Sequence, residues 1–354
     1  MTSPMRIVVV TTSFPRSEDD PSGHFVRSSA EALGKAGHEV HVIAPGGTLL
    51  DPPRRLGELI IHRAGGDWLF AWPGAVARAR EAPWRILAAG PFGLGVMARL
   101  RAIGPVDHAV AHWMVPSGWP LLARTRGSLE VVAHGADVRV LLRLPAPVRE
   151  AIVGSLLERA SRITFVARAL ELSLRRSLPP EIAEVLARAS HVEPPPIDVP
   201  DVAPRARSLR ASLELAPGER LLVVVCRLVT SKRVDLALEA AALVKDPPVR
   251  LVIVGDGPER ASLEQRAGSL GVLARFVGAL PRREAMAWIA AADALLHPSA
   301  IEAAPTVIRE ARALDVHVVA CDVGDVAAWA DDDPGIAVAE PNAAALAAAV
   351  ERMI

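Results

Sequence analysis

The residues best suited to chemistry are two glutamates in the C-terminal half. Glu302 follows a short apolar run, and Glu310 lies inside a helix that the sequence predicts from Pro305 onward. Backbone N–H groups at the start of that helix, near Thr306 and Val307, have no partner within the helix and suit a phosphate. Two carboxylates placed in this way could hold two different hydroxyl-bearing groups. Taken singly, each glutamate could also belong to a solvated helix face.

A pair of cations lies in a second loop of the same half. Arg227 and Lys232 follow an apolar run and come just before a predicted helix. Two cations in such a loop, beside the positive end of a helix dipole, suit a diphosphate. The alternative is a pair of solvated surface cations. Lysine is scarce in this sequence, which favours the anion-binding interpretation of Lys232.

The N-terminal half has polar residues at the ends of strand-like runs. Gly23 precedes a predicted helix and could bring backbone N–H groups close to an anion, although an ordinary surface loop would look the same. His112 and Trp113 end one strand-like run, and His134 ends another. Asp137 is placed to cap the helix that follows His134. Each histidine could equally be a structural residue bonded to its own turn.

These loops must be positioned by the elements that precede them. Apolar runs such as 6–11, 40–44, 221–226 and 250–254 alternate with longer helix-like runs throughout the chain. Continuous apolar strands with intervening helices indicate parallel sheets that are buried on both faces. Ligands of such sheets bind at the carboxyl ends of the strands, and most of the candidate residues lie in the loops that follow strands. The glycines of Gly255-Asp-Gly257 predict a structural turn, because the pattern lacks the third glycine of a dinucleotide site.

A proline-rich stretch separates the two halves. Residues 193–210 contain five prolines, a composition that predicts neither a helix nor an interior strand. We therefore expect a linker here, between domains 1–200 and 201–354. The predicted fold is α/β, with two Rossmann-like domains whose parallel sheets face a central cleft.

Composition narrows the class of protein. Hydrophobic residues make up 51% of the chain, which is enough for two cores, and the formal net charge is +0. That balance argues against nucleic-acid binding. Cys226 and Cys321 cannot form a disulfide framework, and no signal peptide is recognisable, so we expect a cytoplasmic protein. The apolar run 86–98 is interrupted by glycine and proline, and we expect it to be too short to span a bilayer.

The motifs of the C-terminal half resemble those of the retaining glycosyltransferases of family 4, which have the GT-B fold. The E-x7-E motif of that family is present as Glu302 and Glu310. The resemblance implies that Glu310 binds the ribose of a nucleotide donor and that Glu302 lies near the donor sugar as a catalytic residue. It further implies that Arg227 and Lys232 neutralise the donor diphosphate, with Thr306 and Val307 also contributing to donor binding.

The resemblance extends to the N-terminal half. His134 matches the histidine of the family that contacts the sugar or stabilises the leaving phosphate, which makes it the second catalytic candidate. Gly23 matches the N-terminal glycine loop near the phosphates, and His112 and Trp113 are candidates on the acceptor side. The implied activity needs no cofactor and no metal: a hexose-type sugar moves from a UDP- or GDP-sugar, with retention, to a glycan or lipid-linked acceptor of cell-surface polysaccharide or glycolipid synthesis.

Two other functions fit the same fold. A nucleotide-sugar 2-epimerase would use a similar donor site without an acceptor surface, and a non-catalytic homologue would only bind the nucleotide-sugar. A surface of mixed aromatic and arginine residues in 67–101 bears on this choice; its members are Trp68, Phe70, Trp72, Trp84, Phe92, Arg78, Arg80, Arg85, Arg99 and Arg101. It predicts peripheral contact with the inner membrane face, or alternatively ordinary helix packing with arginines that reach solvent.

Overall fold

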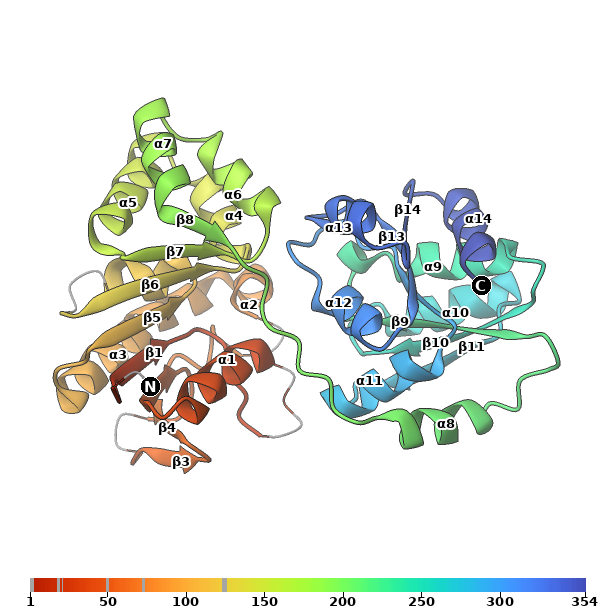
Figure 1. Ribbon diagram of the computed structural model, residues 1–354, viewed down its shortest axis with the longest axis horizontal. Helices are drawn as coiled ribbons and strands as arrows, with labels where there is room; N and C mark the ends of the chain where they lie inside the picture. The colour runs from red at the N-terminus through yellow and green to blue at the C-terminus, as the bar shows by residue number, and fades with distance from the viewer. Residues whose placement is uncertain (1–2, 18–19, 21, 49–50, 72–73, 123–125) are drawn as a thin grey trace. The chain divides into compact units, whose positions relative to one another are not determined.

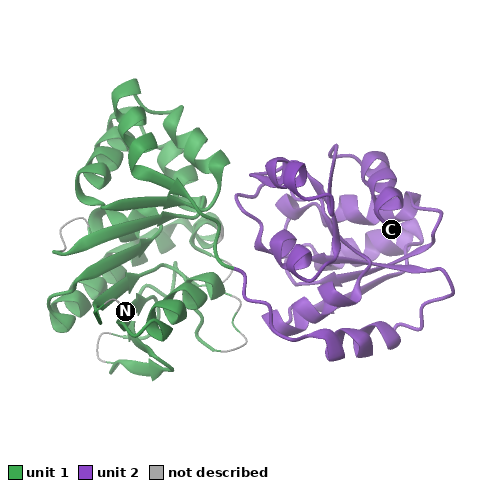
Figure 2. Ribbon diagram, in the orientation of Figure 1, with its two compact units in different colours: residues 1–196 green, residues 197–354 purple. Residues whose placement is uncertain are grey.

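The computed structural model describes residues 3–17, 20, 22–48, 51–71, 74–122 and 126–354. The chain divides into two compact units, Met1–Pro196 and Ile197–Ile354, which Figure 2 shows in different colours. The division falls inside the proline-rich stretch. Each unit is an α/β domain with its own sheet.

Unit 1 is built on an eight-stranded sheet in the order β3-β4-β2-β1-β5-β6-β7-β8 (Figure 1). Neighbouring strands run parallel except for the β3–β4 hairpin. In register, Ile7 of β1 lies between Val40 of β2 and His108 of β5. The strands are β1 Arg6–Val10, β2 Glu39–Ala44, β3 Arg54–Leu56, β4 Leu59–Arg63, β5 His108–His112, β6 Ser128–Ala133, β7 Arg162–Phe165 and β8 Ser190–Val192.

The helices of unit 1 connect these strands. Val26 and Ala30 of the first helix are buried in one apolar cluster with Ile7, Val40 and other residues of β1, β2 and β4. That burial fixes the helix on one face of the sheet. The helical elements are α1 His24–Lys35, α2 Ala75–Glu81, η1 Pro83–Ala88, α3 Ala89–Ile103, η2 Met114–Leu122, α4 Ala136–Arg143, α5 Ala146–Arg159, α6 Arg168–Arg175 and α7 Pro180–Ala189.

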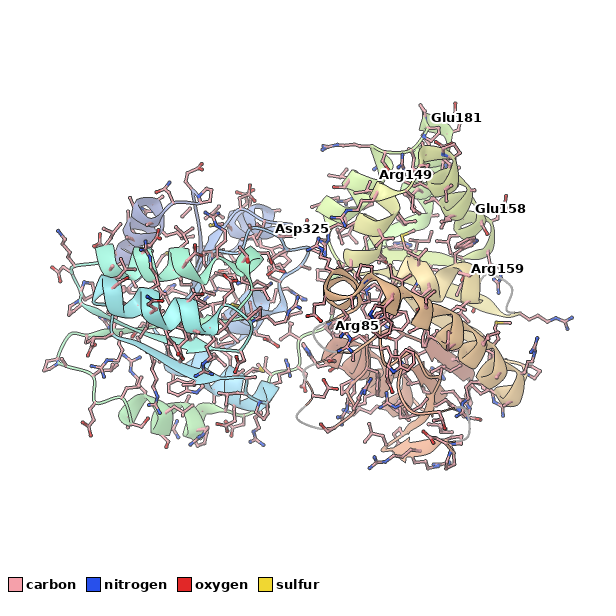
Figure 3. All side chains as sticks on the ribbon, turned by 180° about the vertical axis from the view of Figure 1, so that it is seen from behind. Arg85, Arg149, Glu158, Arg159, Glu181 and Asp325 are labelled. Atoms are coloured by element: carbon pink, nitrogen blue, oxygen red, sulfur yellow. The ribbon has the colours of Figure 1, made fainter. Side chains whose placement is uncertain are left out.

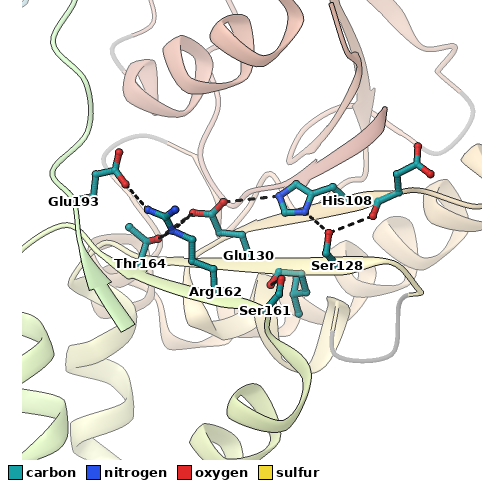
Figure 4. A network of polar contacts seen from close by, with 9 residues as sticks. His108, Ser128, Glu130, Ser161, Arg162, Thr164 and Glu193 are labelled. Carbon is teal, nitrogen blue, oxygen red and sulfur yellow. Dashed lines mark hydrogen bonds and ion pairs between the residues drawn. The ribbon is translucent and has the colours of Figure 1, made fainter. Parts of the chain in front are cut away.

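One face of β5 to β8 carries a network of polar side chains. Along β6, Leu129, Val131 and Ala133 are buried, whereas Glu130 points to the other face and takes part in a polar network (Figure 4). The Thr164 hydroxyl donates to Glu130 over 3.0 Å, and the Arg162 guanidinium lies 3.6 Å from the same carboxylate. The pKa of Glu130 is held below its ordinary value, chiefly by His108, whose Nε2 lies 3.8 Å from the Glu130 carboxylate. Ionised side chains therefore join neighbouring strands across this face.

Unit 2 has a six-stranded parallel sheet in the order β11-β10-β9-β12-β13-β14. Alternate residues of β9 enter two separate cores: Leu222 and Val224 pack with α9, α10 and α14, while Leu221 and Val223 pack with α8, α11 and α12. The strands are β9 Arg220–Val225, β10 Val249–Val254, β11 Ala274–Gly278, β12 Ala294–His297, β13 His317–Cys321 and β14 Ile336–Ala339. The helices are α8 Ala203–Ala211, η3 Thr230–Lys232, α9 Val234–Leu243, α10 Arg260–Leu270, α11 Arg282–Ala291, α12 Thr306–Ala313, α13 Val326–Asp332 and α14 Ala343–Met353.

The prediction that residues 193–210 form a linker without a helix was wrong in part, because the stretch contains most of helix α8. Helix α8 begins at Ala203, and Pro204 occupies its first turn, where the missing N–H has no intrahelical partner to lose. Ala206 and Leu209 are buried against the core that α11 shares. The other four prolines of the stretch precede α8, so the extended linker is shorter than the composition indicated.

The apolar run 86–98 is not interrupted by its glycines and proline, contrary to the prediction. The run belongs to a helical segment of 21 residues, Pro83–Ile103, which is long and apolar enough by length and composition to cross a membrane; 28% of its most apolar window is buried. Pro91 does not interrupt the helix, since it lies in the first turn of α3. The glycines of the run are accommodated within the same helix.

Candidate functional site

Glu302 is the centre of a polar cluster at the carboxyl end of β12. Its carboxylate accepts a hydrogen bond from the Lys232 ammonium and another from the Ser299 hydroxyl, which lies 3.1 Å away. Nε2 of His297, the last residue of β12, lies 3.2 Å from the same oxygen of Glu302. Lys232 comes from η3, so the cluster joins the loops that follow β9 and β12.

The environment of Glu302 keeps it ionised. Burial raises the pKa of this carboxyl, but the contact with His297 and the charge of Lys232 outweigh burial and bring the pKa to about 2. The predicted catalytic glutamate and the predicted donor-binding lysine therefore form one ion pair. His297 and Ser299, which are buried beside them, were missed by the sequence analysis. The signal that could have found His297 is its place at the end of a strand-like run.

The loop that carries Arg227 is held by the glycine turn after β10. The amide of Leu228 donates to the carbonyl of Asp256 over 3.0 Å, and the amide of Glu259 donates to the carbonyl of Leu228 over 3.1 Å. A Cβ at Gly255 would lie 1.8 Å from the carbonyl oxygen of Cys226, and one at Gly257 would lie 2.3 Å from that of Leu228. The two loops therefore meet backbone to backbone, and the turn acts as a support for the cationic loop.

The second glutamate of the motif has a different partner. Helix α12 begins at Thr306, followed by Val307, and the buried Glu310 accepts a hydrogen bond of 2.8 Å from Nε of Arg282. Arg282 is the first residue of α11, and it also donates to the carbonyl of Asp198 over 2.7 Å. In this structure Glu302 and Glu310 thus belong to two separate ion pairs. Arg282 was not anticipated from the sequence.

In unit 1, the candidate residues of three loops come together in an aromatic cluster. Nδ1 of His112 and Nε2 of His134 are 2.8 Å apart, and their rings stack with centroids 5.1 Å apart. The Trp113 ring lies 4.8 Å from that of His134, and the Phe25 ring lies 4.9 Å from it. Phe25 is the second residue of α1, directly after the helix start that Gly23 caps.

Gly23 has a steric reason to be glycine. Its φ of 62° lies in the left-handed region, and a Cβ would fall 2.2 Å from the carbonyl oxygen of Ser13. The loop after β1 therefore folds back tightly on the start of α1. Because of this close approach, the Phe25 ring packs against that of His134.

Burial keeps the histidine pair neutral. It lowers the pKa of His112 to about 4, and burial together with the nearby His112 lowers the pKa of His134 well below its ordinary value. One ring nitrogen of the contact must then donate and the other accept. The pair can exchange hydrogen bonds with a ligand near neutral pH without carrying charge.

Asp137 organises this cluster rather than capping a helix, which corrects the prediction for it. The N-cap of α4 is Gly135, and the buried Asp137 carboxylate accepts hydrogen bonds from the amides of Met114 at 2.7 Å, Gly135 at 2.9 Å and His134 at 3.2 Å. Burial raises its pKa, while the backbone hydrogen bonds oppose that rise. Asp137 thus ties the loop after β5 to the loop after β6. Between them Trp113 has a φ of 77°, a strained conformation for a bulky residue.

Comparison with known proteins finds a family match in the C-terminal unit and relatives that extend over most of the chain. Residues 206–354 match the family described as Glycosyl transferases group 1. A Bacillus subtilis protein that carries the name of teichuronic acid biosynthesis glycosyltransferase TuaC is 26% identical, over 98% of this chain and 89% of its own length. A GDP-mannose-dependent alpha-mannosyltransferase of Mycobacterium tuberculosis is 28% identical, over 90% of this chain and 80% of its own length.

The fold is shared with solved glycosyltransferase structures. Sucrose-phosphate synthase from Thermosynechococcus elongatus superposes with a TM-score of 0.76 at 20% identity, covering 98% of this chain and 89% of that one. Together with the two α/β units and their mostly parallel sheets, this confirms the predicted GT-B fold. Most of the C-terminal unit thus matches the Glycosyl transferases group 1 family, and the two full-length relatives carry the names of glycosyltransferases.

Proposed function

We propose that this protein is a retaining glycosyltransferase of family 4. In this proposal it moves a hexose-type sugar from a UDP- or GDP-sugar to a glycan or lipid-linked acceptor, without a metal ion and in the cytoplasm. The observation that carries the proposal is the ionised Glu302, held by Lys232, Ser299 and His297 at the carboxyl end of β12. This cluster lies in the unit that matches the group 1 family and contains the E-x7-E motif.

Lys232 can donate hydrogen bonds to two anions at once in such a reaction. An ammonium has three N–H donors, so it can keep its bond to Glu302 and still donate to a diphosphate oxygen. As the bond between C1 of the sugar and the diphosphate breaks, negative charge grows on the leaving group. The fixed cations Lys232 and Arg227 stabilise that charge without reorganising. The acceptor oxygen bonds to C1 on the same face, and the acceptor hydroxyl proton passes to the released diphosphate.

The remaining candidates have roles consistent with this reaction. A neutral His134 can donate a hydrogen bond to the donor sugar or to the leaving phosphate, with His112 fixing its orientation. Glu310 would receive the ribose hydroxyls, and for that its bond with Arg282 must rearrange or be shared. The backbone N–H groups of Thr306 and Val307, at the start of α12, would face a phosphate.

The relatives support a cell-surface product. One carries a name from teichuronic acid biosynthesis, and another is named as GDP-mannose-dependent. A polymer or lipid-linked acceptor and a mannose-type donor are therefore the first substrates to test.

The test is ligand-dependent stabilisation followed by product analysis. The unfolding temperature is measured with UDP, GDP, ADP and their sugars in the presence of a chelator. A ligand at 100 times its dissociation constant adds about 2.7 kcal/mol to the folded state. The expected result is a rise with one nucleotide, abolished in Lys232→Ala and retained in the matched variant Lys35→Ala at the end of α1.

The products then separate the competing functions. Release of the free nucleotide with transfer of the sugar to an added acceptor supports a glycosyltransferase. An epimerised nucleotide-sugar with no nucleotide released would show a 2-epimerase. Binding without any turnover, with all acceptors tested, would show a non-catalytic homologue.

A further inference from the structure

Exposed apolar side chains gather on one segment of unit 1. Half of the large apolar side chains that are exposed in the described part of the chain lie within residues 68–97: Trp68, Val76, Trp84, Ile86, Leu87, Leu94 and Met97. They belong to the loop after β4 and to α2, η1 and α3. The indole rings of Trp68 and Trp84 meet edge to face at 6.0 Å, so the loop and η1 form one continuous surface. Trp72 lies outside the described residues.

Helix α3 is apolar on two faces. Phe92 and Val96 are fully buried, while Leu94 is 72% exposed and Leu87, near the end of η1, is 76% exposed. A helix that is apolar all round is normally covered on all sides. Here the second face stays exposed in the described part of unit 1, and an exposed apolar face of this kind marks a site of interaction.

The contacts that hold α3 on unit 1 argue against this helix crossing a bilayer. A Cβ at Gly95 would fall 2.2 Å from the carbonyl oxygen of Ala64, so α3 packs directly on the backbone after β4. The Arg99 guanidinium donates to the carbonyl of Arg63 over 3.0 Å and to that of Asp51 over 2.7 Å. To span a bilayer, the helix would have to abandon these bonds and expose Phe92 and Val96. Its composition therefore reflects a surface contact.

Charge identifies the partner. Residues 75–103 contain five arginines and one glutamate, a formal charge of +4 in a chain whose total is +0. Arg80 and Arg101 are exposed at the two ends of the segment. The Arg85 guanidinium, labelled in Figure 3, lies 6.0 Å from the centre of the Trp84 ring and 2.8 Å from Glu81. Exposed tryptophan, leucine and arginine side chains, gathered in one segment, are typical of elements that rest in the interface of an anionic bilayer.

We propose that these exposed residues form a membrane-docking surface, here called the α3 surface, which binds the headgroup region of anionic lipid bilayers. The apolar side chains of the surface enter the boundary between headgroups and acyl chains, and Arg80 and Arg101 pair with lipid phosphates. The proposal stands on unit 1 alone and does not depend on the donor site. Were the acceptor lipid-linked, the same surface would bring the enzyme to it.

The experiment measures binding of the full chain to vesicles by co-sedimentation. Vesicles of phosphatidylcholine alone are compared with vesicles of phosphatidylcholine and phosphatidylglycerol, at low and at high salt. We expect binding to the anionic vesicles that weakens as salt screens the arginines. Each arginine near an anionic surface contributes about fivefold to binding, so Arg80→Gln with Arg101→Gln should weaken binding about 25-fold.

The apolar contribution is tested by a matched pair of double variants. Leu87→Gln with Leu94→Gln removes two exposed leucines of the α3 surface and should weaken vesicle binding about tenfold or more. Leu243→Gln with Leu273→Gln removes two leucines of unit 2 that are 47% and 63% exposed, and it should leave binding unchanged. Unfolding temperatures of both variants confirm that they are folded.

Three outcomes would overturn the proposal. The first is no binding of the unaltered chain to anionic vesicles at low salt. The second is equal loss of binding in the two leucine variants. The third is a dimer in solution that Leu87→Gln with Leu94→Gln converts to a monomer, because the α3 surface would then contact a second copy of the chain. A nucleotide-induced rise in unfolding temperature is measured separately, so failure here leaves the proposed function untouched.

Discussion

The ionised Glu302 gives the sharpest test of the site, because its charge must appear in the acid stability of the fold. The ordinary pKa of a glutamate is 4.5, and in the folded protein that of Glu302 is about 2. Because the folded pKa is the lower one, Glu302 stabilises the fold above pH 4.5, and this contribution is lost as the pH falls toward 2. The difference corresponds to about 3 kcal/mol in total, of which about 2 kcal/mol is lost by pH 3.

The perturbation is Glu302→Gln, which keeps the shape of the side chain and removes its titration. The free energy of unfolding is measured with urea at pH 7 and pH 3 for the unaltered chain and the variant. We expect the unaltered chain to lose about 2 kcal/mol more than the variant between the two pH values. The matched control is Glu158→Gln on α5, an exposed glutamate labelled in Figure 3, which should follow the unaltered chain.

A double variant separates the charge from the pairing. Glu302→Gln alone leaves the Lys232 ammonium half-buried without its carboxylate, so its stability at pH 7 should fall. Adding Lys232→Met should recover part of that loss while keeping the flat response to pH. If the unaltered chain and Glu302→Gln lost the same free energy between pH 7 and pH 3, the argument that Glu302 is held ionised by its neighbours would be refuted.

The other predictions concern the supports of the site. Gly255→Ala should destabilise unit 2 by several kcal/mol, because φ is 137° there and the new Cβ would lie 1.8 Å from the Cys226 carbonyl oxygen. Gly268→Ala in α10 has open space around the new Cβ and should not destabilise the protein. Thermal unfolding of both variants checks this, and equal melting temperatures would contradict it. His112→Phe should lower the turnover rate and leave nucleotide affinity unchanged, because it removes the partner of His134 and leaves the proposed nucleotide-binding residues Lys232 and Glu310 unaltered. Steady-state kinetics and calorimetry check this, and a change in affinity alone would point to a structural role. Lys232→Ala and Glu310→Ala should each weaken donor binding about tenfold or more in calorimetry, and unchanged affinity in both would remove these residues from the donor site.

Local sequence patterns predicted most of the strands. Runs such as 221–226 and 250–254 lie within one residue of β9 and β10, because strands buried on both faces must be continuously apolar. Where the pattern is mixed, the prediction was wrong. Pro204 suggested an extended chain, yet a proline in a first turn permits the helix that α11 then covers. Glycine and proline in 86–98 likewise suggested an interruption that the tertiary contacts of α3 override.

The site could be predicted only one residue at a time. Position after a strand was enough to nominate His134 and Glu302, since ligands of parallel sheets bind there. The partners that influence the charge of these two residues come from elements distant in sequence. His112 is the partner of His134, and Lys232 is the partner of Glu302. Arg282, which bonds Glu310 from another helix, has no local signal at all. Burial and pairing, which decide the pKa values, are properties of the folded chain.

The stacked pair of His112 and His134 has a consequence for selectivity. If His112 Nδ1 carries the shared proton, then neutral His134 must carry its own proton on Nδ1 and offers a donor there. If His134 Nε2 carries the shared proton, His134 Nδ1 becomes an acceptor, and the proton of His112 moves to its far nitrogen. The two arrangements have the same charge and differ only in tautomer. A ligand that demands either role thereby sets both rings at once, and the cluster can accommodate opposite hydrogen-bonding partners without taking up a proton from solvent.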